Sequence, residues 1–245
     1  MPSALLEVEG VTKRYGGLVA NDGVAMTIAP GEVRGLIGPN GAGKTTFVNL
    51  LTGIEALDAG RIRFGGADLT GLAANDIAAR GLVRTFQVAR VFANLSVREN
   101  LLLPFLAAGS PGGVRAGEAL AAELLAIATL EHLAEEPAGV LSGGQRMLLQ
   151  ACAGFMIPSV RLYVLDEPFA GINPVVKDIL IGLIERENAS KQRAFLIVSH
   201  EMAIVRRLCP RVTVMIQGRV AAEGTLDEIA RLPEVIAAYL GQAAA

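Results

Sequence analysis

Gly38-Pro39-Asn40-Gly41-Ala42-Gly43-Lys44-Thr45 is the stretch that decides the fold of this 245-residue chain. It has the spacing GxxxxGK[ST], which forms a phosphate-binding loop when a strand precedes it and a helix follows it. Residues 32–37 predict a buried strand, and residues 44–52 predict a helix that Gly53 stops. In such a loop, backbone N–H groups point inward at the β-phosphate of a nucleotide, and the helix N-terminus adds a partial positive charge.

The side chains at the end of this loop predict a nucleoside triphosphate bound together with a metal ion. Lys44 is placed to reach the β- and γ-phosphates, and the hydroxyl of Thr45, which Thr46 follows, to hold Mg²⁺. An ordinary glycine turn is the alternative. The chain has only four lysines, however, and one of them occupies the required position. We therefore expect residues 38–46 to bind ATP.

A second motif, Leu162-Tyr163-Val164-Leu165-Asp166-Glu167, is an apolar strand that ends in two acids. In a nucleotide site, the first carboxylate helps to hold Mg²⁺, and the second accepts a proton from the attacking water. Two acids at a strand end are more often a solvated helix cap. The phosphate-binding loop in the same chain favours the catalytic interpretation, with Asp166 on the metal and Glu167 as the base.

A third motif, Leu141-Ser142-Gly143-Gly144-Gln145, stands before a helical pattern. Its paired glycines free the backbone, and a helix start presents N–H groups and the Ser142 hydroxyl to an anion. Alone, the motif is a Gly-Gly turn with serine as the helix cap. Its position between the other two motifs indicates a role in nucleotide binding for residues 142–145.

Single residues give weaker signals. His200 follows a predicted strand at Ala194–Val198, where a parallel sheet ends and ligands bind. Gln87 could contact Mg²⁺ or the attacking water, and Tyr15 could stack on adenine. The alternatives are a structural histidine, an uninvolved glutamine and a core aromatic. For His132, on a predicted helix over residues 118–132, the structural interpretation stands.

The order of the predicted elements indicates an α/β fold. Residues 4–30 predict short antiparallel strands that break at glycines, and the second half alternates strands with helices, which implies a mostly parallel, covered sheet. Asn173 and Pro174 predict a helix start, and Thr225 with Glu228 forms a capping box for a C-terminal helix. Residues 88–158 contain no convincing strand and predict a helical insert.

Composition limits the classes of function. The net charge of −2 gives no reason to expect a nucleic acid partner, whereas a hydrophobic fraction of 52% and a mean hydropathy of +0.46 are consistent with an apolar interface. We find no membrane-spanning segment and no secretory signal, so we expect a cytoplasmic protein. Cys152 and Cys209 form no CxxC pair and are expected to be buried thiols.

These motifs, in this order, resemble the ATP-binding subunit of an ATP-binding cassette (ABC) transporter over essentially the whole chain. In that family, residues 38–45 would be the Walker A loop, Gln87 the Q-loop and residues 141–145 the signature motif. Asp166 and Glu167 would end the Walker B strand, His200 would be the switch histidine, and Tyr15 the aromatic that stacks on adenine. The resemblance implies a P-loop NTPase core with an N-terminal antiparallel β subdomain and an inserted α-helical subdomain.

Further stretches resemble the importers of branched-chain amino acids. They are residues 81–87, 97–101, 167–174, 200–202 and 233–241. The same subfamily handles urea and short amides, a lipopolysaccharide-export ATPase is similar, and a non-transport ABC ATPase is a further alternative. Asn173, Val198-Ser199 and a short Gly/Ala-rich linker after Leu101 depart from the pattern of the wider family or subfamily.

The resemblance also implies how the chain is organised and what it contacts. Residues 1–87 and 159–224 would form the nucleotide-binding core, residues 88–158 the helical subdomain and residues 225–245 a C-terminal extension. Catalysis would rest on Lys44, Gln87, Glu167 and His200, and Mg²⁺ on Thr45, Gln87 and Asp166. Two such subunits, identical or paralogous, would enclose ATP between a Walker A loop and the partner's signature motif. The chain would reach the cytoplasmic face of the membrane only through separate permease subunits.

Overall fold

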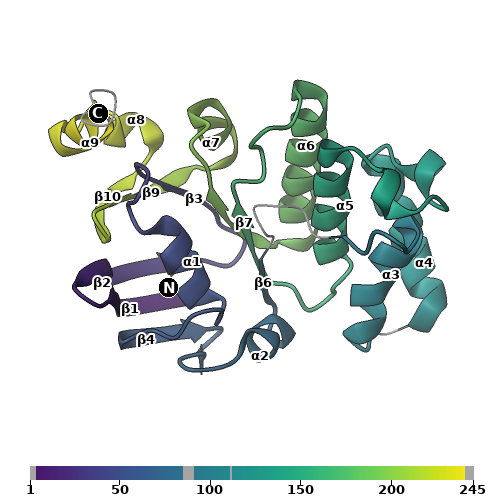
Figure 1. The fold of residues 1–245 in the computed structure, drawn as a ribbon, viewed down its shortest axis with the longest axis horizontal. Coiled ribbons are helices and arrows are strands. Elements are labelled where there is room, and N and C mark those ends of the chain that lie inside the picture. Colours follow the sequence, from purple (N-terminus) through teal and green to yellow (C-terminus); the bar gives the residue numbers. More distant parts are fainter. Residues whose placement is uncertain (1–3, 85–90, 111, 241–245) are drawn as a thin grey trace.

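The computed structural model describes residues 4–84, 91–110 and 112–240, which form two β-sheets with helices packed around them (Figure 1). The larger sheet has the strand order β10-β9-β3-β8-β7-β6. Its strands are β3 (Val33–Ile37), β6 (Leu82–Arg84), β7 (Leu162–Asp166), β8 (Ala194–Val198), β9 (Arg211–Ile216) and β10 (Arg219–Gly224). All neighbouring strands are parallel except β10, which pairs antiparallel with β9. The predicted mostly parallel sheet is confirmed.

The smaller sheet is antiparallel, as predicted for the N-terminal part. It has the order β2-β1-β4-β5, with β1 (Leu6–Tyr15), β2 (Leu18–Ile28), β4 (Ala59–Phe64) and β5 (Ala67–Asp68). The expected breaks at Gly10 and Gly23 are not turns between short strands. Both glycines have positive φ and lie inside β1 and β2, where register shifts interrupt the pairing. Such bulges bend a strand without ending it.

The helices lie on both faces of the larger sheet and at its ends (Figure 1). They are α1 (Lys44–Leu51), α2 (Ala74–Ala79), α3 (Val97–Ala107), α4 (Gly113–Ile127), α5 (Gly143–Phe155), α6 (Pro174–Lys191), α7 (Met202–Leu208), α8 (Leu226–Ile229) and α9 (Pro233–Leu240), with 3-10 turns η1 (Glu131–Leu133) and η2 (Ala138–Val140). No strand occurs among the described residues between β6 and β7, which confirms the predicted helical insert.

Two predicted helices differ from the observed ones. The helix expected over residues 118–132 is α4, which begins earlier, at Gly113, and ends earlier, at Ile127. It ends earlier because Thr129 has a φ of 56°, which turns the chain. His132 therefore lies on η1. The capping box of Thr225 and Glu228 is formed as predicted, but it opens the four-residue α8. A separate helix, α9, follows it.

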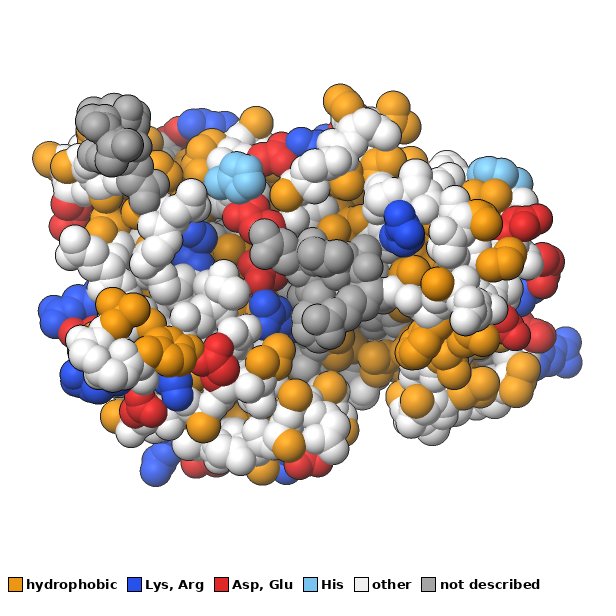
Figure 2. Space-filling model, viewed as in Figure 1, with side chains coloured by type: hydrophobic (Ala, Val, Ile, Leu, Met, Phe, Trp, Pro, Cys, Tyr) orange, Lys and Arg blue, Asp and Glu red, His pale blue; other side chains and the backbone are white. Residues whose placement is uncertain are grey.

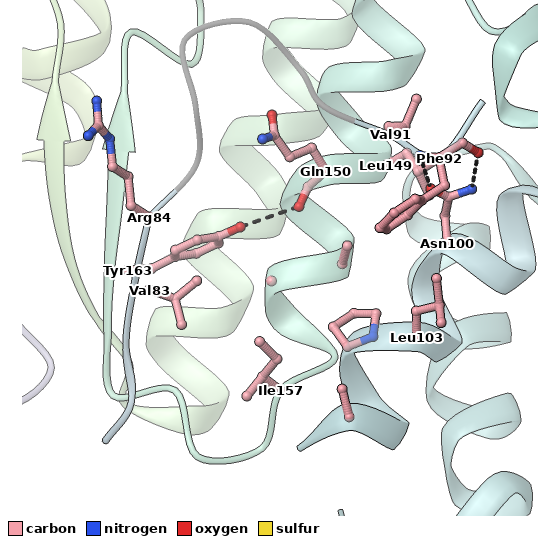
Figure 3. Close-up of a pocket in the computed structure, with 14 residues that line it drawn as sticks. Val83, Arg84, Val91, Phe92, Asn100, Leu103, Leu149, Gln150, Ile157 and Tyr163 are labelled. Carbon is pink, nitrogen blue, oxygen red and sulfur yellow. Dashed lines mark hydrogen bonds between the residues drawn. The ribbon is translucent and has the colours of Figure 1, made fainter. Parts of the chain in front are cut away.

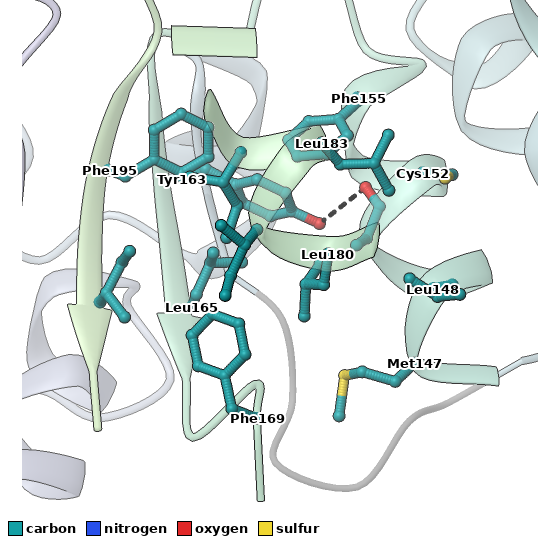
Figure 4. Packing of buried hydrophobic residues seen from close by; sticks show 14 of the residues in the cluster. Met147, Leu148, Cys152, Phe155, Tyr163, Leu165, Phe169, Leu180, Leu183 and Phe195 are labelled. Carbon is teal, nitrogen blue, oxygen red and sulfur yellow. Dashed lines mark hydrogen bonds between the residues drawn. The ribbon is translucent and has the colours of Figure 1, made fainter. Parts of the chain in front are cut away.

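The core is divided by the larger sheet into two layers. Because side chains of a strand point alternately to opposite faces, Leu162 and Val164 pack toward α1 and the smaller sheet, while Tyr163 and Leu165 pack toward α5 and α6. On the second face, the rings of Phe155, Tyr163 and Phe195 meet edge to face or tilted, with centroids 5.1–6.2 Å apart (Figure 4). The sheet is therefore covered on both faces, as its apolar strands require.

Both cysteines belong to this core, as expected. Cys152 and Cys209 are buried and unpaired, and burial raises the pKa of each thiol to about 12. A thiol with so high a pKa is inert near neutral pH.

A buried ion pair lies between Glu187 on α6 and Arg193, which follows the end of α6. Arg193 Nη1 lies 2.7 Å from Glu187 Oε2, and both side chains are almost completely buried. The same guanidinium donates to the backbone carbonyl of Phe155, the last residue of α5, and to that of Ile157 just after it. Arg193 thus fixes the end of α5 against α6, and α5 carries the signature motif at its other end.

We predict that Arg193→Met lowers the free energy of unfolding by about 3–5 kcal/mol, since it leaves the Glu187 carboxylate without its cation in the core. Urea denaturation followed by circular dichroism measures the change. The double variant Glu187→Leu/Arg193→Met is the control, because it removes both charges, and it should lose less stability than the single variant. A single variant as stable as the unmodified chain would contradict this account of the pair.

Candidate active site

The phosphate-binding loop is held in shape by close backbone contacts on both sides. Gly38 has a φ of 152°, and a Cβ atom there would lie 2.2 Å from the carbonyl oxygen of Met215 on β9. Gly43 has a φ of 92°, and a Cβ atom there would lie 2.3 Å from the carbonyl oxygen of Ala20 on β2. Only glycine fits either position, so the loop's fixed shape depends on both.

Polar groups of neighbouring strands complete this support. The amide nitrogen of Asn21, a residue with no exposed surface, donates to the Gly43 carbonyl at 3.2 Å. The N–H of Gly218, in the β9–β10 turn, donates to the Ala42 carbonyl at 3.0 Å. Helix α1 then begins at Lys44, and its N-cap, Gly43, provides no side-chain hydrogen bond to the helix start. The free N–H groups of such a helix start are suited to an anion.

Lys44 bends back over this loop. Its Nζ donates to the carbonyls of Gly38 at 2.7 Å and Pro39 at 3.0 Å. Burial lowers the pKa of the ammonium, and the nearby carboxylates of Glu167 and Asp166 oppose this by raising it. The lysine is therefore held next to the loop and the two acids before any phosphate is present.

The loop opens into a pocket of about 560 Å³ that gathers most of the predicted nucleotide-binding residues. Its walls come from β1, β2, the loop with α1, the ends of β7 and β8, and the β9–β10 turn. The lining residues are Tyr15, Leu18, Val19, Ala20, Asn40, Gly41, Ala42, Gly43, Lys44, Thr45, Thr46, Asp166, Glu167, Val198, Gln217 and Gly218.

The two acids lie where β7 ends. Asp166 is the last residue of that strand and is 2% exposed, and Glu167 follows with a φ of 49° and an N–H bonded to the Val198 carbonyl at 2.9 Å. A positive φ is uncommon for a residue other than glycine and is typical of functional positions. Nδ1 of His200 lies 2.9 Å from Oε2 of Glu167, and its side chain is 66% exposed. His200 is not one of the residues that line the pocket, and it reaches the site through this contact.

Tyr15, the last residue of β1, lines the same pocket. Its ring is 45% exposed, which does not fit the alternative of a core aromatic. Its hydroxyl donates to the carboxylate of Glu55, and this hydrogen bond raises the pKa of Tyr15 and lowers that of Glu55. An exposed ring fixed at its hydroxyl leaves a face for a flat ligand to stack on.

The signature residues are not part of this pocket. Ser142 and Gly143 are exposed at the start of α5, where Ser142 Oγ accepts the N–H of Gln145 at 3.3 Å and the Gln145 side chain accepts the N–H of Ser142 at 2.8 Å. This capping box makes residues 142–145 a well-formed helix start. The resemblance implied that these residues face the ATP of a partner chain, and they do lie outside the pocket of their own chain.

The predicted metal ligands fall into two groups. Thr45 and Asp166 both line the pocket, whereas Gln87 lies outside the described residues. Within the described ranges there is no cluster of three or more histidine, cysteine or acidic side chains that could hold a metal. Mg²⁺ needs no such cluster, since it takes one or two protein oxygens together with phosphate oxygens and water. A hydroxyl and a carboxylate at the phosphate loop fit that ion.

Sequence reasoning missed three polar residues behind the pocket. Arg84, at the end of β6, places Nη2 2.8 Å from Asp166 Oδ2 and Nη1 2.5 Å from Asn49 Oδ1. The amide of Asn49 donates to Glu55 at 2.6 Å, and Glu55 in turn accepts the Tyr15 hydroxyl. A charged residue that ends an apolar strand was the available signal for Arg84. Nothing in the local sequence marks Asn49 or Glu55.

Comparison with known proteins places this geometry among transport ATPases. A family model described as ABC transporter matches residues 21–170. The chain is 39% identical over 256 residues to the high-affinity branched-chain amino acid transport ATP-binding protein BraF of Pseudomonas aeruginosa, covering 99% of the chain and 100% of the relative. It is 38% identical to the corresponding protein LivG of Escherichia coli, with the same coverage.

Solved structures agree with the fold. The ADP conformation of MJ1267, an ATP-binding cassette of an ABC transporter, superposes with a TM-score of 0.85 at 32% identity, covering 98% of this chain and 99% of that one. A dimeric post-hydrolysis state of the cassette MJ0796, bound to ADP and Pi, has a TM-score of 0.80 at 22% identity, covering 90% and 98%. The second likeness supports the fold alone.

We predict that Lys44→Ala weakens ATP binding by about 10- to 100-fold, because it removes the charged donor at the phosphate loop. Isothermal titration calorimetry measures the affinity. Arg61→Ala is the control, since Arg61 is an exposed cation on β4 outside the pocket. The affinity of this variant for ATP should equal that of the unmodified chain. Unchanged affinity in Lys44→Ala would remove Lys44 from the site.

Proposed function

The chain belongs to the ABC transporter family, as an ATP-binding and ATP-hydrolysing subunit, and from this premise we propose that it powers the import of branched-chain amino acids through separate membrane subunits. The observation that carries the choice of substrate is the full-length similarity to BraF and LivG, both named as branched-chain amino acid transport ATP-binding proteins. In this proposal the chain binds and hydrolyses ATP, and the membrane subunits form the pathway through which the amino acid crosses the membrane.

We assign the phosphates of ATP to the loop of residues 38–46 and the adenine to Tyr15. The N–H groups at the start of α1 and the Lys44 ammonium face the space where β- and γ-phosphates would lie. Thr45 and Asp166, with Gln87, would hold Mg²⁺, which supplies charge neutralisation on the phosphoryl group when it is bound. Each of these assignments rests on the pocket that gathers the described residues among them.

Glu167 and His200 would carry the chemistry of water attack. The Glu167 carboxylate is held at the carboxyl end of β7, beside the loop, where it can orient a water and accept its proton. The 2.9 Å contact from His200 Nδ1 would orient that carboxylate, and the exposed imidazole would be free to contact the γ-phosphate. Lys44 would stabilise the charge that develops on the transferred group.

The signature motif would act on the ATP of a second subunit. Ser142 and Gly143 are exposed on the start of α5, outside the pocket of their own chain, so a bound ATP would lack this helix start unless a partner brings one. Two chains related head to tail would each present residues 142–145 to the other's γ-phosphate. ATP would then favour the closed pair by binding it better than the open one.

We predict that Glu167→Gln lowers the rate of ATP hydrolysis by about 100-fold or more, because the amide cannot accept the proton. Nucleotide affinity should persist, and the variant with Mg-ATP should elute as a dimer on size-exclusion chromatography, since closed pairs would no longer reopen. The control is Glu185→Gln, an exposed acid on α6 that pairs with Arg207. A monomeric Glu167→Gln with full turnover would exclude this scheme.

An apolar groove on the helical side is the proposed contact for a membrane subunit. It measures about 440 Å³, and its walls come from β6, the segment before α3, α3, α5 and β7 (Figure 3). Hydrophobic side chains gather over α3 on the face drawn in Figure 2. Phe92 and Leu103 line the groove and are exposed. No helix in the described ranges combines the length and apolar character needed to cross a bilayer. We propose that the chain lies at the cytoplasmic face of the membrane, held there by its partners, as the full-length similarity to two transport ATP-binding proteins supports.

We predict that Leu103→Asp weakens this attachment by about 30-fold, as expected for a buried apolar anchor at an interface. The readout is the fraction of the chain that sediments with membranes of its own organism. Leu106→Asp is a closely matched control, because Leu106 is equally apolar and exposed on α3 but does not line the groove. If both variants sediment like the unmodified chain, the groove is not the attachment site.

A further inference from the structure

Arg84 lies between the nucleotide pocket and the apolar groove. Its side chain is 9% exposed, and it ends β6, the edge strand of the larger sheet. The residue lines the groove, while its guanidinium points away from the other labelled side chains of Figure 3, toward the strands. There it contacts Asp166, which is 3% exposed. A cation that lines the apolar groove thus contacts an acid that lines the nucleotide pocket.

The fork of this guanidinium binds two partners at once. Nη2 contacts the Asp166 carboxylate at 2.8 Å and Nη1 the Asn49 carbonyl oxygen at 2.5 Å. Asn49 lies on α1, and its amide donates to Glu55, which also accepts the Tyr15 hydroxyl. Asp166 is therefore connected through Arg84 and Asn49 to α1, and through Glu55 to the Tyr15 hydroxyl.

The contact between Arg84 and Asp166 also changes how strongly the pocket attracts a cation. A buried carboxylate would attract a divalent cation whether or not a nucleotide is bound. The Arg84 guanidinium offsets the charge of Asp166 across a distance of 2.8 Å between Nη2 and Oδ2. The other two charged residues that line the pocket in the described part of the chain, Lys44 and Glu167, are of opposite sign, so without a nucleotide the pocket presents little net attraction for a cation. Triphosphate oxygens then become necessary for the cation to bind.

We propose that Arg84 is a positioning residue that holds Asp166 in place and restricts divalent cation binding to the nucleotide complex. The proposal rests on the proposed function, in which Asp166 faces Mg²⁺. Arg84 has two separable effects in this role: its charge sets the cation affinity, and its two-pronged geometry fixes the carboxylate relative to α1.

Charge and geometry are separated by two substitutions. Arg84→Met removes the charge and keeps the apolar stem along the groove. Arg84→Lys keeps the charge, but its ammonium lacks the rigid fork that spans Asn49 and Asp166. Arg98→Met is the matched control. Arg98 lies on α3, outside the nucleotide pocket, and forms an exposed ion pair with Glu135.

The readout is the binding of Mn²⁺, followed by the electron paramagnetic resonance of the free ion, in the absence of nucleotide and with ADP. In the nucleotide-free chain we expect Arg84→Met to bind Mn²⁺ about fivefold or more tightly than the unmodified chain, since a repelling charge has been removed. Arg84→Lys and Arg98→Met should match the unmodified chain in this measurement. ATP turnover should fall in both Arg84 variants, and KM for ATP should change less than kcat, because the positioned carboxylate acts in the reacting complex.

Each outcome bears on one hypothesis. The inference about Arg84 is wrong if the unmodified chain binds ADP but the nucleotide-free Arg84→Met variant binds Mn²⁺ no more tightly than the nucleotide-free unmodified chain. If the unmodified chain binds no ADP at all, it is the proposed function that fails. Thermal unfolding identifies a variant that does not fold; Arg84→Gln, which is also neutral but polar, then carries the same expectation for Mn²⁺.

Discussion

The structure depends on the tight passage of the phosphate-binding loop between β2 and β9. At both Gly38 and Gly43 the neighbouring backbone leaves no space for a Cβ atom, and hydrogen bonds from Asn21 and Gly218 fix the loop from outside. The loop therefore has its shape before a nucleotide arrives, so little ordering entropy opposes binding. The antiparallel sheet contributes to function in this way: β2 is one wall of the loop, and β1 brings Tyr15 to the same pocket.

The parallel pairing of β7 with β8 explains where Asp166 and Glu167 lie. Parallel strands deliver their carboxyl ends to one edge of a sheet, and the pairing of Asp166 with Val198 brings the end of β7 beside the end of β8. Glu167 is then turned by its positive φ, and its N–H is bonded to the Val198 carbonyl, so the carboxylate is directed to the pocket and to His200. The backbone strain at this residue is stored where it orients a reacting group.

Sequence alone predicted those parts of the fold and site that are set locally. The loop, the apolar strand ending in two acids and the caps of Ser142, Asn173 and Thr225 each follow from neighbouring residues, and the structure contains all of these elements. The boundaries of α4 were wrong, because its Gly/Ala-rich segment gives a weak periodic pattern and Thr129 ends it through a conformation that sequence does not signal. The contacts of Arg84 with Asn49 and Asp166 span 35 and 82 residues and depend on how β6, α1 and β7 meet, so no local pattern could reveal them.

The separation of the signature motif from the loop has a physical rationale. A site complete within one chain would hydrolyse ATP whether or not any partner had moved. Here Glu167 and His200 follow the ends of β7 and β8 and Lys44 begins α1. The exposed helix start of residues 142–145 lies instead on α5, which Arg193 fixes to the end of α6. In the proposed function, chemistry that needs both parts would proceed only when a second molecule docks, and a transporter could use that docking motion. The buried pair of Arg193 and Glu187 holds the end of α5 against α6, and it would help the two helices to move together when the second molecule docks.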